Sequence, residues 1–478
     1  MRFRRLHLLL QRIIIFGFSA LLLLSCKDRS MEGMILFTRV SKEQQQTDYS
    51  TGSSWRYLPE SGIVAMDPSH SDAPVTMLTE AFYSACAPDI SYDARSMVFA
   101  GQKNKGEPWQ IWEMDLHSLK VRQINSSTEN CTDPVYLPGE RIAFSKLTRD
   151  GSGTEAHALF TVNLDGSETK RITFNPNTYF ASSVLKDGRV LSVSQELYPL
   201  KKEAMLMVLR PDGTKAELFY KGLAGSVPLS RGKETVHGQI AMVEADQKTP
   251  EKGKLILVDY RRPMHSKLDL SEGIEGSFYS LSPENNGKFL VSYRASENEA
   301  YGLFEFDPES KSFEKPLYQD KEFNAMEAVL VEKRERPKKI PSEVNMDSDT
   351  GLLLCQDINF SGYHKAQNGI ETKTAVKMEI LGLDASLGIV DAEKDGSVYL
   401  KIAADTPFKI QTLDQEGRVI NGPGSWIYLR PNERRGCVGC HQGNEMVPDN
   451  HQPLSVLKEP IIIPKLPKLM AKTNVESE

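Results

Sequence analysis

Cysteine is scarce in this chain, which contains only six among 478 residues. A content this low excludes a small fold stapled by several disulfide bonds. A four-cysteine zinc ribbon is excluded as well, because it needs two cysteine pairs and the sequence has a single Cys-x-x-Cys pair. A basic excess is also missing: 58 Lys and Arg face 64 Asp and Glu, and the formal net charge of −6 gives no indication of nucleic-acid binding.

Long apolar runs are equally rare, since a single one, residues 13–24, lies near the N-terminus. It is too short for a comfortable membrane span. Four arginines precede it, as is typical of an export signal: Arg2, Arg4, Arg5 and Arg12. Leu23-Leu24-Ser25-Cys26 resembles a bacterial lipobox, which implies cleavage before Cys26 and lipidation of its thiol.

We therefore expect a lipoprotein signal peptide over residues 1–25 and a tether over residues 26–33. The mature protein would then be held by lipid in the bacterial cell envelope, on the periplasmic side of the inner or the outer membrane. An uncleaved anchor, or an ordinary signal peptide with an incidental cysteine, is the alternative interpretation.

The cysteine pair belongs to Cys437-Val438-Gly439-Cys440-His441, the pattern of a haem c attachment site. Two thiols at this spacing reach both vinyl groups of one haem, and the histidine that follows can ligate the iron. We predict covalent haem c on Cys437 and Cys440, with His441 as the iron ligand. A thioredoxin-like redox pair is disfavoured, because such pairs lie in α/β units and the preceding sequence looks β-rich.

A weak repeat of roughly 40–50 residues, the length of a four-stranded propeller blade, runs from about Met34 to Glu332. Short apolar runs with β-branched and aromatic residues predict strands, and Asp-Gly pairs predict tight hairpin turns. We expect a six-bladed β-propeller over residues 34–335, with seven blades as the alternative count. Residues 328–331 are expected to return and complete the first blade. A pair of β-sandwiches is the competing architecture.

A charged stretch with two prolines, residues 333–341, predicts a solvated linker. Beyond it, alternating apolar segments predict a small β-sandwich-like domain over residues 336–455 that ends in the haem motif. Residues 456–478 are expected to form a C-terminal tail. The predicted fold class is therefore all-β.

Residues 338–454 resemble the middle domain of the hydrazine synthase alpha subunit family. The resemblance rests on residues 404–407 and on the Arg-rich approach to the motif, residues 425–441. The propeller is similar to the same family at residues 108–114 and 131–134, and residues 87–175 resemble TolB-like β-propellers. A propeller packed on a haem-bearing domain is implied. We expect no hydrazine synthesis, because the family's alpha subunit has a further C-terminal haem domain and this sequence ends at Glu478.

One position departs from the family pattern. There, a tyrosine four residues after the motif histidine ligates the iron and the histidine binds zinc, whereas this sequence has Glu445. An ordinary axial role for His441 is therefore favoured. The alternative is a zinc site of His441 with Cys131 and Asp89 from the propeller. Cys131 could instead form a disulfide with Cys86 or be a buried thiol, and Cys355 is expected to be plain core.

Three arginines before the motif are expected to pair with haem propionates, because guanidinium groups bind carboxylates bidentately. They are Arg430, Arg434 and Arg435, and a solvated basic rim is the alternative. Trp426 is expected either to pack on the haem edge or to fill the domain core.

The sixth iron position has several candidates. Met446 is one, His451 and His364 are others, and an open site is the remaining option. A Met or His ligand suits electron transfer, and an open site suits small-ligand chemistry.

These features favour an exported, lipid-anchored monohaem c protein that transfers electrons or serves as a subunit of a periplasmic redox complex, with a redox partner protein. The alternative is a lipoprotein whose propeller binds a protein or ligand and whose haem or zinc site is structural or sensory. A haem-dependent oxidoreductase is a third hypothesis, for which the sequence identifies no general base or substrate pocket.

Overall fold

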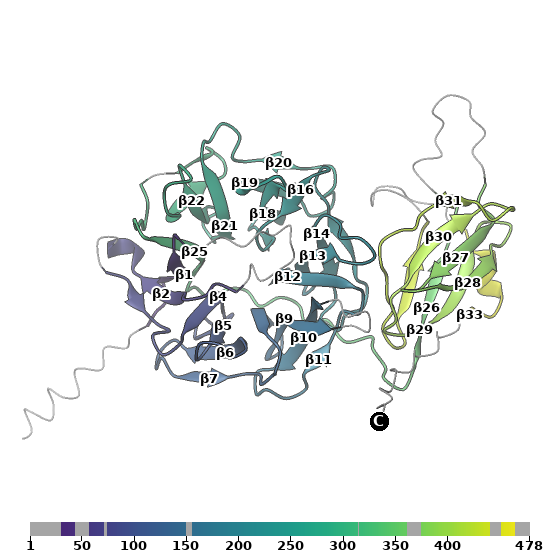
Figure 1. Cartoon of the computed structure of the whole chain (residues 1–478), viewed down its shortest axis with the longest axis horizontal. Helices are drawn as coiled ribbons and strands as arrows, with labels where there is room; N and C mark the ends of the chain where they lie inside the picture. Colours follow the sequence, from purple (N-terminus) through teal and green to yellow (C-terminus); the bar gives the residue numbers. More distant parts are fainter. Residues whose placement is uncertain are drawn as a thin grey trace, which may run out of the picture.

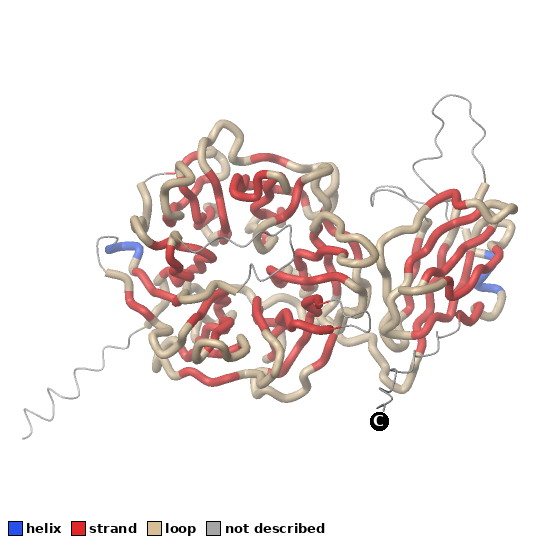
Figure 2. The backbone as a smooth tube through the Cα atoms, in the orientation of Figure 1, coloured by secondary structure: helices blue, strands red, loops and turns tan. Residues whose placement is uncertain are grey.

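The computed structural model of the chain describes residues 30–43, 57–70, 74–149, 155–313, 315–360, 374–439 and 451–463. A ring of sheets and a smaller β domain lie side by side (Figure 1). Strands run through both parts (Figure 2), and the helical segments among the described residues are the short turns η2 (Pro68–His70) and η4 (Leu454–Leu457). The predicted all-β class with a propeller is confirmed.

Six antiparallel sheets follow one another around the ring, and we number them blades 1–6 in chain order. Blade 1 contains β1 (Ile35–Ser41), β2 (Gly62–Met66), β3 (Thr76–Met77) and β25 (Phe323–Leu330), and blade 2 contains β4 (Ser84–Ile90), β5 (Ser96–Gln102), β6 (Gln110–Asp115) and β7 (Val121–Gln123). Blade 3 contains β8 (Cys131–Leu137), β9 (Arg141–Arg149), β10 (Glu155–Asn163) and β11 (Lys170–Arg171), and blade 4 contains β12 (Asn177–Val184), β13 (Val190–Glu196), β14 (Met205–Leu209) and β15 (Glu217–Tyr220). Blade 5 contains β16 (Ser226–Pro228), β17 (Lys233–Glu234), β18 (Gln239–Asp246), β19 (Thr249–Asp259) and β20 (Leu268–Asp269), and blade 6 contains β21 (Ser277–Pro283), β22 (Phe289–Arg294), β23 (Gly302–Asp307) and β24 (Ser312–Phe313).

Blade 1 closes the ring, because its strands come from both ends of the propeller segment. β25 pairs antiparallel with β1, from Ile35 opposite Leu330 to Ser41 opposite Phe323. The expected return of the chain near residue 328 is therefore observed. Ring closure of this kind leaves only short, protected sheet edges.

Carboxylates join neighbouring blades around the central channel. Glu327 of blade 1 accepts a hydrogen bond from the backbone N–H of Ala87 in blade 2, at 3.0 Å. Asp89 of blade 2 accepts one from Tyr136 in blade 3 at 2.9 Å, and Asp133 of blade 3 accepts one from Ala181 in blade 4 at 3.0 Å. These acidic side chains near the channel therefore have a structural role, because each satisfies a buried backbone donor.

The second domain is built from two four-stranded sheets that enclose an apolar core. One sheet contains, in spatial order, β32 (Arg434–Cys437), β26 (Thr350–Cys355), β29 (Val398–Ala403) and β33 (Ile461–Ile463), and the other contains β28 (Ser386–Asp391), β27 (Lys377–Leu381), β30 (Lys409–Leu413) and β31 (Val419–Asn421). β33 was expected to belong to the C-terminal tail, but it pairs in parallel with β29.

No helix among the described residues is long and apolar enough to cross a membrane. The predicted signal peptide and the lipidation site Cys26 lie outside the described residues.

Candidate functional site

The Cys-x-x-Cys-His motif begins at the last residue of strand β32, Cys437. β32 runs parallel to β26, and the last pair of this ladder is Cys437 opposite Cys355. The N–H of Gln356 donates to the carbonyl oxygen of Cys437 at 2.8 Å, which fixes the backbone at the first motif cysteine. Cys437 is partly exposed, at the end of an edge strand. Cys440, His441 and Met446 lie outside the described residues.

Gly439 lets the motif lie directly on the turn that follows β26. Its φ of 149° falls in a region that side-chain-bearing residues rarely adopt. A Cβ atom at this position would lie 2.5 Å from the carbonyl oxygen of Asp357 and 2.7 Å from Cβ of Phe360. The glycine between the two motif cysteines is therefore required by a close backbone contact.

The thiol of Cys437 is activated by its surroundings. Its hydrogen bond with the Cys355 thiol is the main cause that lowers its pKa to about 7, with a contribution from the positive charge of Arg435. Burial acts in the opposite direction and is outweighed. Because the thiolate is the reactive form of cysteine, Cys437 is set up for nucleophilic chemistry near neutral pH.

We expect the haem-free protein, with Cys355 and Cys437 kept reduced, to show the lowered thiol pKa as a shifted pH profile of alkylation. The rate at which iodoacetamide modifies Cys437 should reach half its maximum near pH 7, because a lowered pKa gives more thiolate at neutral pH. Peptide mass spectrometry over a pH series would measure it. In Cys355→Ala, which removes the main hydrogen bond, the midpoint should move up toward about 8.5, the usual thiol value. A wild-type midpoint already at that value would contradict the assignment.

Two of the three arginines before the motif bind protein carboxylates. Arg430 pairs with Asp405 at 2.6 Å, and its guanidinium lies 4.5 Å above the ring of Phe174 in the propeller. Arg435 pairs with Glu433 at 2.7 Å. Arg434 is exposed, and within the described residues its side chain makes no ion pair. Of the three, Arg434 therefore has a guanidinium available for a haem propionate.

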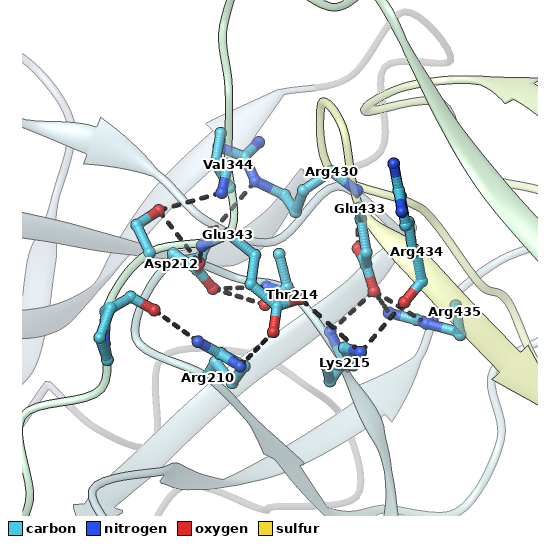
Figure 3. A network of polar contacts seen from close by, with 12 residues as sticks. Arg210, Asp212, Thr214, Lys215, Glu343, Val344, Arg430, Glu433, Arg434 and Arg435 are labelled. Atoms are coloured by element: carbon cyan, nitrogen blue, oxygen red, sulfur yellow. Dashed lines mark hydrogen bonds and ion pairs between the residues drawn. The ribbon is translucent and has the colours of Figure 1, made fainter.

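Glu433 is the centre of the contact between the second domain and blade 4 (Figure 3). Its side chain is fully buried. One carboxylate oxygen accepts the N–H of Lys215 in the propeller at 2.9 Å, and the other accepts the N–H of Arg430 at 2.8 Å. The same contact includes Arg430 Nε, which donates to the carbonyl oxygen of Asp212 at 3.1 Å.

Further residues of the segment before the motif extend this contact. Trp426 donates from Nε1 to the carbonyl oxygen of Tyr198 in the propeller at 2.7 Å. The Tyr428 hydroxyl lies 3.0 Å from the carbonyl oxygens of both Ile172 and Gly213. Trp426 thus packs between the domains and is not part of the apolar core of the second domain, whereas its expected place at the haem edge stays a prediction. The Arg- and Trp-rich pattern of this segment indicated a role at a functional site, but it gave no indication that the segment packs the second domain against the propeller.

The two propeller residues considered as zinc ligands each have partners within the propeller. Asp89 is bonded to Tyr136 and lies 3.5 Å from the Arg334 guanidinium. Cys131 is five residues before Tyr136 on β8. Its thiol accepts a hydrogen bond from Asn125, and burial raises its pKa to about 11. Among the described residues, no group of three His, Cys, Asp or Glu side chains is arranged to hold a metal ion.

The remaining candidates are placed as follows. Cys86 and Cys131 are buried and are not joined by a disulfide. His451 is exposed, with Nε2 3.7 Å from an oxygen of Asp395. His364 lies outside the described residues.

A cavity lies between the linker and the propeller blades. Its volume is about 360 Å³, and its lining includes Tyr92, Arg231, Lys233 and the linker residue Arg334. The N–H of Arg334 donates to the carbonyl oxygen of Tyr92 at 3.0 Å, so this part of the linker is bound to the propeller and is not simply solvated as expected. Burial and the neighbouring Arg231 lower the pKa of Lys233 to about 7.

Comparisons with known proteins agree with this arrangement. Residues 352–442 match the family model of the hydrazine synthase alpha subunit middle domain. The chain is 22% identical to hydrazine synthase subunit alpha of Kuenenia stuttgartiensis over 538 aligned positions, which cover 86% of this chain and 66% of the relative. The predicted resemblance to this family is confirmed, although the match spans slightly less than two thirds of the relative's length.

A solved structure shows a similar fold. Hydrazine synthase of Kuenenia stuttgartiensis superposes with a TM-score of 0.76 at 19% identity, over 89% of this chain and 71% of that chain. TolB of Acinetobacter baumannii is a more distant neighbour, with a TM-score of 0.45 at 15% identity over 65% of this chain and 68% of that chain. At these identities the structural likeness describes the fold and leaves the activity to be established from the site.

Proposed function

We propose that this chain is an exported, lipid-anchored monohaem c protein that transfers electrons or serves as a subunit of a periplasmic redox complex. Cys437 and Cys440 would hold the haem through thioether bonds, His441 would ligate the iron, and Met446 is our candidate for the sixth position. Cys26 would carry the lipid. The family relationship supports a redox context, since the relative is named as a subunit of hydrazine synthase.

The observation that carries the proposal is the presentation of Cys437. The thiol sits partly exposed at the end of β32, on a backbone fixed by β26, and its pKa is lowered to about 7. Addition of a thiol to a haem vinyl group needs an accessible, nucleophilic sulfur, so this residue fits a thioether. Gly439, which continues the motif, is held against the turn at Asp357.

When bound, haem supplies one-electron chemistry at the iron. The chain's own residues would place and shield it. Cys437 would hold the haem covalently, and the exposed Arg434 would be available to pair with a propionate. The contacts of Glu433 and Arg430 with blade 4 then fix this edge of the second domain relative to the propeller, so that the haem and the propeller would present one surface to a redox partner protein.

The test is a comparison of wild-type protein with Cys437→Ala/Cys440→Ala, both made in a host competent in haem c maturation. The wild type should carry one covalent haem by intact mass and pyridine haemochrome spectrum, and the double variant should lose it completely, because no thiol is then left at the motif. A wild-type protein that is full length, correctly exported and free of haem would overturn the proposal.

The cavity beneath the linker favours a second candidate function, in which the propeller binds a ligand and the haem is structural or sensory. The cavity is lined by both polar and apolar side chains, among them the basic residues Arg231 and Lys233. The two candidates differ in what haem removal does. If electron transfer is the function, removing the haem should abolish the reversible redox potential and leave the chain folded. If the haem is structural, removing it should unfold the second domain.

A further inference from the structure

Cys355 and Cys437 face each other across the β26–β32 ladder. They are register partners on adjacent parallel strands, so their side chains project from the same face of the sheet. Adjacent strands lie about 4.8 Å apart, and disulfide-bonded cysteines have Cα atoms about 4.4–6.8 Å apart. Both residues are thiols in this structure, and they share a hydrogen bond.

The two thiols differ in their exposure. Cys355 is 3% exposed and belongs to the core of the second domain, whereas Cys437 lies at the edge of that core and is partly open to solvent. An oxidant can therefore reach Cys437 first, and Cys355 is then the neighbouring thiol in position to complete the exchange.

We propose that Cys355 and Cys437 form a disulfide bond in the haem-free protein, which makes Cys355 a modification site that competes with haem for Cys437. The bond itself depends only on the strand pairing. The competition rests on the proposed function, because a Cys437 sulfur in a disulfide is unable to form a thioether.

The reaction is a thiol–disulfide exchange with a disulfide-bearing oxidant. The Cys437 thiolate attacks one sulfur of the oxidant, whose S–S bond breaks and whose other sulfur leaves as a thiolate. Cys355 then attacks Cys437 in the mixed disulfide, the S–S bond between the two protein residues forms, and the second oxidant sulfur leaves. The thiol protons of Cys355 and Cys437 are taken up by the two thiolates that the oxidant releases. Two protein thiols are therefore oxidised while the disulfide of the oxidant is reduced.

The first arm of the test needs no variant. The full-length wild-type chain is made without haem c maturation, oxidised with glutathione disulfide, alkylated, digested and mapped by mass spectrometry. The expected product is a peptide pair joined through Cys355 and Cys437, and it should persist in Cys440→Ala. Recovery of Cys437 only as an alkylated thiol, as a glutathione adduct or joined to Cys440 would overturn the proposal.

The second arm measures haem loading under oxidising conditions, in a maturation-competent host supplied with excess glutathione disulfide. Cys355→Ser, which keeps a hydrogen-bonding group beside Cys437 and removes the thiol, should load several-fold more covalent haem than the wild type, and Cys131→Ala, which removes a buried thiol of the propeller, should load like the wild type. Equal loading of Cys355→Ser and wild type would refute the competition. If no version binds haem, the proposed function fails, and the peptide map of the first arm still decides the disulfide.

Discussion

Replacing Glu433 with alanine is expected to lower the free energy of unfolding by about 3–5 kcal/mol, the usual cost of breaking a buried ion pair by removing one partner. The carboxylate is fully buried and accepts hydrogen bonds from the N–H groups of Lys215 and Arg430, as well as from the guanidinium of Arg435. Its loss leaves two backbone donors and one buried cation without their acceptor. Since Lys215 belongs to the propeller, the contact between the two domains should weaken at the same time.

Urea unfolding followed by tryptophan fluorescence would measure this effect, because Trp426 lies at the same interface. Limited proteolysis should cut the variant faster within residues 331–349. The matched control is Glu416→Ala, which removes a 61% exposed glutamate that pairs with Arg418 in the same domain. Surface pairs of this kind contribute roughly 0–1 kcal/mol. A Glu433→Ala loss no larger than that of the control would show that the network does not hold the domains together.

Replacing Gly439 with alanine should reduce covalent haem by about tenfold or more. The residue has a φ of 149°, and an added Cβ would lie 2.5 Å from a backbone oxygen of Asp357, which is unable to move aside as a side chain would. Forcing a non-glycine residue into such a conformation costs about 1–3 kcal/mol before the steric clash is counted. Residues 437–439 would leave their site on the turn after β26, and Cys437 would no longer be presented to haem in this position.

The control is Gly436→Ala, three residues earlier in the same segment, where an added Cβ meets no heavy atom within 4 Å. Both variants would be made in a maturation-competent host and compared by haem per chain from pyridine haemochrome and intact mass. Gly436→Ala should load like the wild type. Full loading of Gly439→Ala would mean that haem attachment tolerates a displaced motif, and the close contact at Asp357 would then have no role in it.

The parts of this fold that the sequence predicted are those with a local pattern. Short apolar runs and Asp-Gly turns predict strands and hairpins one at a time, and a repeat of such units predicts a propeller. The return of residue 328 to the first blade was also predictable, because the ring needs an inner strand that the N-terminal blade lacks. The haem assignment of Cys437, Cys440 and His441 depends on their spacing within five residues and stays a prediction.

The parts that were missed depend on contacts between distant segments. The expected core position of Cys355 is confirmed, but the pairing of β32 beside it was not predictable, because nothing near Cys355 in sequence indicates it. Arg430 and Arg435 read as partners of a haem because their carboxylate partners, Asp405 and Glu433, could not be distinguished from other acidic residues without the fold. β33 was assigned to the tail because a three-residue apolar run gives no periodicity to measure.

The closure of blade 1 has a consequence for how the chain is made. β1 is apolar and buried along most of its length, and its partner β25 is the last propeller strand to leave the ribosome. At about 5–20 residues per second, β1 waits roughly 15–60 s with an open, aggregation-prone edge. A nascent chain exposes that edge throughout this interval, and any truncation before residue 323 leaves it without its partner strand.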